Sequence, residues 1–86
     1  MKSLNVKIPL TVGQSLDDRG QLNPQYIKDF VQTYLNSPLE DKPILEFTFN
    51  YTLKVDSQLH KDIKIKALNL DLPMNEFLGR LLAQYY

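Results

Sequence analysis

The sequence contains no cysteine and a single histidine, His60, in 86 residues. The lack of cysteine excludes disulfides, thiolate zinc sites and thiol nucleophiles together. A chain this short buries only a modest fraction of its unfolded surface, so such domains commonly depend on a crosslink or on a partner chain. Since no cysteine is available, we expect a partner chain to complete the core.

An excess of charge of one sign and long apolar runs are also missing. Ten Lys and Arg residues balance ten Asp and Glu residues, so any basic surface must come from local arrangement. The longest apolar runs, such as Leu81-Leu82-Ala83, are far shorter than the ~20 residues that a membrane-spanning helix needs. The N-terminus alternates polar and apolar residues, unlike a signal peptide, which favours a cytoplasmic location.

Motifs of catalysis and metal binding are absent as well. The sequence has no phosphate-binding loop, dinucleotide fingerprint or nucleophile elbow. His60 has no second histidine to complete a metal site, and Asp17-Asp18 lack the spacing of a calcium loop. We therefore expect a protein that is not an enzyme and holds no metal or cofactor.

The first half of the chain predicts a strand, a loop and a helix. Residues 5–12 alternate with period two, and Pro9 places this strand at a sheet edge because proline has no N–H to donate. Residues 13–21 hold two glycines without periodicity and are expected to form a loop. Asn23-Pro24 is typical of a helix start. The expected helix carries one apolar stripe, formed by Ile27, Phe30, Val31, Tyr34 and Leu35.

After a linker at 39–43, the second half predicts a strand and two helices. Residues 46–55 alternate almost strictly, the strongest strand signal in the chain, with Phe47, Phe49, Tyr51, Leu53 and Val55 on one face. Asp56-Ser57 offers a helix cap, and a helix stripe follows at Leu59, Ile63, Ala67 and Leu70. Asp71 and Pro73 end this helix, and a last helix begins at Met74 and runs to the C-terminus. No internal repeat of solenoid type is visible.

The order strand, cap, helix, turn, helix over residues 50–86 resembles the ribbon-helix-helix family of DNA-binding proteins. The resemblance implies an α+β fold in which residues ~47–86 form an intertwined homodimer, with one strand from each chain paired antiparallel. We therefore divide the chain into an N-terminal strand-loop-helix extension, residues 1–45, and a ribbon-helix-helix unit for DNA binding and dimerisation, residues 46–86.

The resemblance also implies that the outer face of the ribbon reads base edges in the major groove of DNA. The matching positions are Asn50, Thr52 and Lys54, whose side chains suit adenine, thymine and guanine contacts. The alternative is that these residues are only the solvated face of a sheet. In the family, the N-terminus of the second helix binds a DNA phosphate through backbone N–H groups, which corresponds here to Met74 and Asn75.

The function implied is a sequence-specific, double-stranded-DNA-binding transcriptional repressor, with dimers able to sit side by side on repeated sites. Small proteins of this family also serve as antitoxins or in plasmid maintenance, and in that case residues 1–45 would bind a protein partner. A third interpretation, from another class, is a protein-interaction module without a nucleic-acid role, whose long strand pairs with the strand of a partner.

Overall fold

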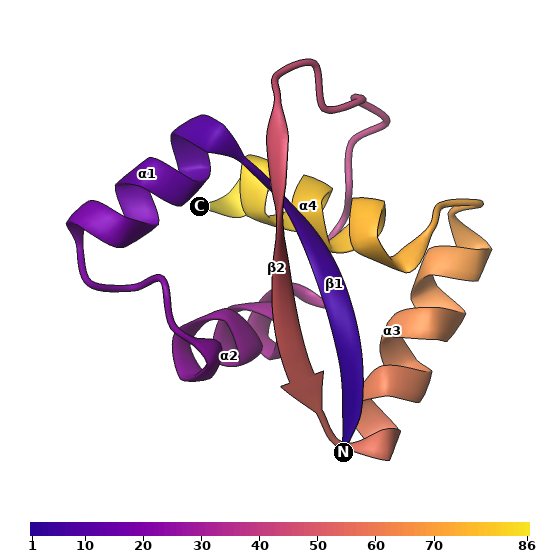
Figure 1. Ribbon diagram of the computed structural model, residues 1–86. Helices are drawn as coiled ribbons and strands as arrows, with labels where there is room; N and C mark the ends of the chain where they lie inside the picture. Colours follow the sequence, from indigo (N-terminus) through magenta and orange to yellow (C-terminus); the bar gives the residue numbers. More distant parts are fainter.

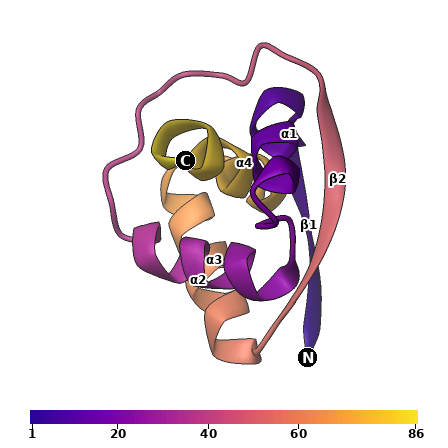
Figure 2. The same cartoon turned by 90° about the vertical axis from the view of Figure 1, so that its left-hand side faces the viewer.

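The structure is a computed structural model that describes residues 1–86. It has two strands and four helices, in the order β1 (Lys2–Pro9), α1 (Leu10–Asp18), α2 (Pro24–Tyr34), β2 (Thr48–Val55), α3 (Ser57–Asn69) and α4 (Met74–Tyr85) (Figure 1). Both strands run along one side of the molecule, and the helices occupy the other side (Figure 2). The predicted α+β class is confirmed.

The two strands form a single antiparallel sheet within the chain. Every residue of β1 pairs with one of β2, from Lys2 opposite Val55 to Pro9 opposite Thr48. This pairing differs from the one that the resemblance implied, in which the same strand of two chains would form the ribbon. The first half of the chain supplies the second strand because its own period-two segment presents an apolar face of matching length.

Three helices begin where the sequence predicted. Asn23 caps α2, with its Oδ1 accepting the Tyr26 N–H at 2.9 Å, and Asp56 caps α3 in the same way through the Leu59 N–H at 2.7 Å. Asp71 adopts a left-handed conformation (φ 57°) in the turn before α4, as expected for a residue that ends a helix. The two caps and the turn could be predicted from the sequence because each depends on the chemistry of nearby side chains.

The segment expected to be a loop, residues 13–21, instead lies largely within α1. Pro9 stands at the N-cap position of this helix and offers no capping side chain. The cap comes from far along the chain, since Glu46 Oε1 accepts the Thr11 N–H at 2.9 Å and its hydroxyl at 2.8 Å. The Leu10 N–H donates to the Phe47 carbonyl at 3.0 Å. A helix stabilised by tertiary contacts of this kind leaves no local N-terminal signal.

The strands also begin and end elsewhere than predicted. β1 begins at Lys2 and ends at Pro9, because α1 starts at Leu10. β2 begins at Thr48, so Phe47 lies outside the sheet and is 84% exposed, whereas the alternation placed it on the buried face. Leu70, assigned to the α3 stripe, is also exposed because it follows the end of that helix.

One hydrophobic core of 17 buried residues joins both halves of the chain. Val6 and Ile8 of β1 are fully buried together with Leu53 and Val55 of β2. The apolar stripe of α2 is also buried in this core, with Tyr34 packed at its margin. Residues 1–45 therefore contribute a strand and two helices to the same core as residues 46–86.

The second helix of each half packs against the strand of the other half. α4 packs closely on β1, and α2 packs on β2. At Gly79 of α4, a Cβ atom would overlap the backbone carbonyl oxygen of Lys7. Alanine or any larger residue at this position would therefore push α4 away from β1 of the same chain.

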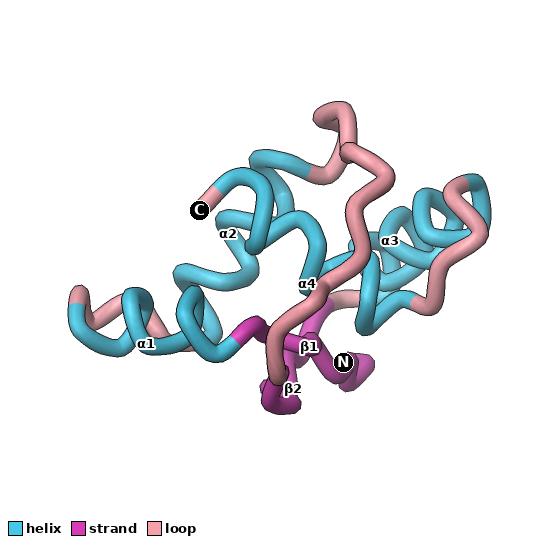
Figure 3. The backbone as a smooth tube through the Cα atoms, turned by 90° about the horizontal axis from the view of Figure 1, so that it is seen from above, coloured by secondary structure: helices cyan, strands magenta, loops and turns pink.

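The two halves repeat one structural motif, strand, helix, helix. α1 begins at Leu10, and α3 begins 47 positions later at Ser57. The paired strand residues Asn5 and Thr52 are also 47 positions apart. In both halves a residue with positive φ, Gly20 or Asp71, lies in the turn between the helices. Seen from above, α1 and α3 lie on opposite flanks of the strands (Figure 3). The repeat was not visible in the sequence because it preserves the apolar spacing and almost no residue identities.

Candidate nucleic-acid interface

Six polar residues alternate along the face of the sheet that points away from the core: Ser3, Asn5 and Lys7 of β1 and Asn50, Thr52 and Lys54 of β2. The last pair of the ladder, Pro9 and Thr48, is buried and half-buried respectively. Five of the six are exposed, and Lys7 is half-buried. We call these six residues the ribbon face. In Figure 2 the two strands form one edge of the molecule, and no helix lies on their outer side.

The ribbon face is organised as three cross-strand pairs. Lys7 lies opposite Asn50 at one end, and Lys54 lies opposite Ser3 at the other end. At the centre, the Thr52 hydroxyl donates to Asn5 Oδ1 at 3.2 Å. Each end therefore presents one ammonium group beside one small polar side chain, and the centre presents an amide and a hydroxyl.

The charge of the ribbon face is positive. Neither strand contains Asp or Glu, and the acids that flank β2 are already engaged. Glu46 binds the N-terminus of α1, and Asp56 caps α3. The backbone N–H of Thr11, followed by its hydroxyl, lowers the pKa of Glu46 below its ordinary value of 4.5. Lys7 and Lys54 are the two charged side chains among the six residues of the ribbon face.

The structure brings Asn50, Thr52 and Lys54 together on this free face, which is the placement predicted for them. Sequence reasoning missed Ser3, Asn5 and Lys7, which complete the face from the other strand. Their signal was present, because the period-two pattern at the N-terminus already placed Asn5 and Lys7 on one parity. What the sequence did not reveal was that this strand pairs with β2.

The predicted phosphate-binding corner lies at the start of α4. Pro73 occupies the N-cap position without a side-chain hydrogen bond, and Met74 and Asn75 are half-buried. The Asn75 side chain accepts the Glu76 N–H at 2.8 Å, which uses one of the free donors of the first turn. The Glu76 carboxylate adds negative charge to the same turn. Backbone N–H groups of Met74 and Asn75 are the donors that this corner offers to an anion.

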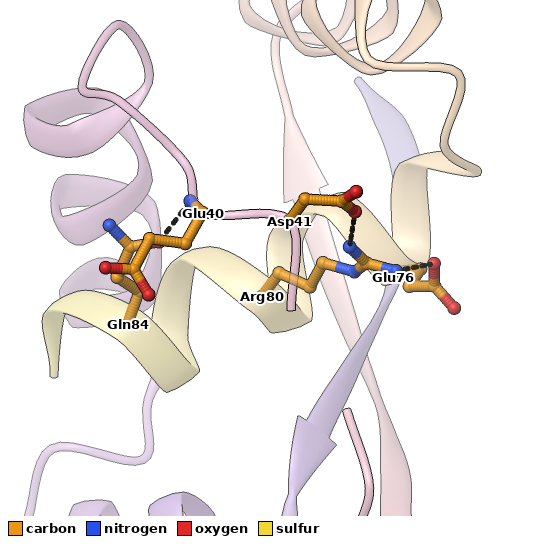
Figure 4. A network of polar contacts seen from close by, with 5 residues as sticks. All are labelled: Glu40, Asp41, Glu76, Arg80 and Gln84. Atoms are coloured by element: carbon orange, nitrogen blue, oxygen red, sulfur yellow. Dashed lines mark hydrogen bonds and ion pairs between the residues drawn. The ribbon is translucent and has the colours of Figure 1, made fainter. Parts of the chain in front are cut away.

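A second polar cluster lies on α4 and fixes the connection between α2 and β2 (Figure 4). Arg80 contacts Glu76 at 3.0 Å and Asp41 at 3.5 Å. The Glu40 N–H donates to Gln84 Oε1 at 2.8 Å. The guanidinium of Arg80 is thus matched by two carboxylates, so we assign this cluster to holding the connection against α4 beside a surface hollow of about 670 Å³.

The remaining candidates from the sequence lie apart. His60 is half-buried on α3, and Asp17 and Asp18 are exposed at the end of α1. No three His, Cys, Asp or Glu side chains gather as a metal site would require. None of the four helices has the length and apolar character needed to cross a membrane.

Comparisons with protein-family models, with curated proteins and with solved structures found no match in any of the three. The fold and site define a class by themselves: a small α+β protein in which a two-stranded antiparallel sheet is covered by helices on one face and carries an uncovered, polar and positively charged second face.

Proposed function

We propose that this protein binds double-stranded DNA in a sequence-specific manner and acts as a transcriptional repressor of ribbon-helix-helix type. The observation that carries the proposal is the ribbon face. Six alternating side chains on two paired strands are all Ser, Thr, Asn or Lys, while the opposite face carries the buried residues Leu4, Val6, Ile8, Leu53 and Val55. A two-stranded ribbon fits the major groove, where side chains of these types bind base edges.

The charge distribution supports the proposal, although the whole chain has a net charge of zero. Phosphate attraction supplies most of the salt-dependent affinity for DNA, so a binding face must be locally positive. The ribbon face meets this requirement because it contains lysine at both ends and no acid. Repression would follow from occupation of a promoter by the bound protein.

The proposed unit differs in one respect from the resemblance. A ribbon-helix-helix unit has two strands and four helices, and the resemblance implied that two chains each supply one strand and two helices. Here one chain supplies all six elements. Association of chains side by side on repeated sites stays a prediction.

The test is a duplex-binding titration at several salt concentrations. We expect the Asn50→Ala, Thr52→Ala, Lys54→Ala triple variant to lose sequence preference and keep its helical circular dichroism. The Lys61→Ala, Lys64→Ala variant is the control, since it removes two exposed lysines of α3, which is not part of the sheet. Absence of a complex even at low salt would overturn the proposal.

One observation favours a second candidate, the protein-interaction module. Leu45 and Phe47, immediately before β2, are 91% and 84% exposed, and each strand of a two-stranded sheet has one unpaired edge. A partner strand could add to β2 and cover these side chains. The antitoxin alternative has less support, because in residues 1–45, which would bind the partner, the apolar stripe of α2 is buried in the core. If the chain binds no DNA, the interaction module with its free edge at β2 becomes the favoured function.

A further inference from the structure

We infer that one copy of this chain is a complete reading unit whose two half-sites on DNA are not equivalent. The inference rests on the proposed function and specifies the substrate, a duplex site that is palindromic only in part. It adds Ser3, Asn5 and Lys7 to the residues that contact bases.

The strand register supports the inference. Asn5 and Thr52 hold equivalent places in the two strand-helix-helix motifs and lie directly opposite each other. Two strands that pair antiparallel through equivalent residues are related by a two-fold rotation about that pair. By this relation Lys7 is the counterpart of Lys54, and Ser3 is the counterpart of Asn50.

The ribbon needs no second copy to be covered. Among the inward-facing residues, Val6, Ile8, Leu53 and Val55 have no exposed surface. Phe49 and Tyr51 on the same face are half-buried against the core. α4 packs on β1 and α2 packs on β2, so both strands are covered by helices of the same chain. A homodimer would place identical side chains at both ends of its ribbon, whereas this ribbon has different neighbours beside its two lysines.

Those neighbours predict the asymmetry of the site. Lysine donates to guanine O6 and N7, and asparagine forms two hydrogen bonds with adenine. Serine can form a hydrogen bond with more than one base, so it discriminates little between them. The end with Lys7 and Asn50 should select guanine and adenine. The end with Lys54 and Ser3 should select guanine with little choice at the adjacent base pair. The sequence selected should therefore have guanine in both halves and a fixed adenine in one half only.

The experiment is selection of bound duplexes from a random-sequence library, with the mass of each complex measured by native mass spectrometry. We expect one chain per site and a partly palindromic consensus. Lys7→Ala should relax the guanine of one half and Lys54→Ala that of the other, each with about a tenfold loss of affinity. Ser3→Asn should introduce adenine preference into the permissive half, and Asn50→Ser should remove it from the other.

Four outcomes would overturn the inference. A full palindrome bound by two chains, or relaxation of both halves by either lysine variant, would show symmetric reading and leave the proposed function intact. A site unaffected by Ser3→Asn and Lys7→Ala would show that β1 does not read bases. Failure of the wild-type chain to select any sequence would remove the proposed function itself. Circular dichroism of each variant shows whether the fold is retained, and these exposed or half-exposed positions are expected to retain it.

Discussion

Asn5 and Thr52 face each other at the centre of the sheet, and the hydroxyl of Thr52 donates to Oδ1 of Asn5 at 3.2 Å. The two residues belong to different halves of the chain and occupy equivalent places in them. Their pairing relates the two strand-helix-helix motifs by an approximate two-fold rotation. It also shows how a short chain without cysteine builds a core, since each half covers the other.

Thr52→Val should separate stability from recognition. The hydrogen bond to Asn5 is exposed, and a cross-strand pair of this type is worth about 0.2–1 kcal/mol. Valine fits a strand well, so we expect the free energy of unfolding to change by less than about 1 kcal/mol. Base preference at the centre of the site should change, as measured by duplex selection. A large loss of stability would indicate that the ribbon face is structural.

Gly79→Ala should destabilise the fold. The added Cβ would overlap the carbonyl oxygen of Lys7, and overpacking of this kind costs about 1–3 kcal/mol. The higher helix propensity of alanine, about 1 kcal/mol, offsets only part of this. Urea unfolding measures the difference. Gly20→Asn is the control, because Gly20 has open space around it and asparagine tolerates its positive φ. A stabilised Gly79→Ala variant would contradict the packing of α4 on β1.

Leu16→Ala and Ile63→Ala should each destabilise the whole chain by about 2–5 kcal/mol. Both side chains are fully buried in the same core, although one belongs to each half. NMR amide signals from residues 1–45 and 46–86 should disappear at the same urea concentration in each variant. Loss of one half before the other would show two independent units.

Acidification should release the cap of α1. The hydrogen bonds from Thr11 lower the pKa of Glu46 in the folded state below the ordinary 4.5 of the unfolded chain. Their contribution to stability is therefore fully present above pH 4.5 and is lost as the pH falls through the lowered pKa. An NMR titration of the Glu46 carboxyl carbon checks this.

Thr11→Val tests the origin of that lowered pKa. The variant removes the hydroxyl and keeps the backbone N–H, which is the larger cause. The pKa of Glu46 should rise part of the way to its ordinary value. An unchanged pKa would remove the hydroxyl from the explanation, and a complete return would mean that the backbone N–H contributes nothing.

Local signals explain which parts of the fold were predicted. α2 and α3 were readable because Asn23 and Asp56 cap them with their own side chains. α1 was not readable because Pro9 cannot cap it and the cap, Glu46, lies 35 residues along the chain. For the site, the alternation of β2 revealed Asn50, Thr52 and Lys54, but only the pairing of strands showed that Ser3, Asn5 and Lys7 join them.

The sequence by itself determined the apolar spacing. From that spacing follow the α+β class, two strands with one apolar face each, and three of the four helices. These features could be predicted because periodicity and helix caps act over a few residues. Only the tertiary structure decided the partner of each strand. An alternating strand can pair with any strand of matching pattern, so the period-two signal names no partner; in the folded chain β1 pairs with β2.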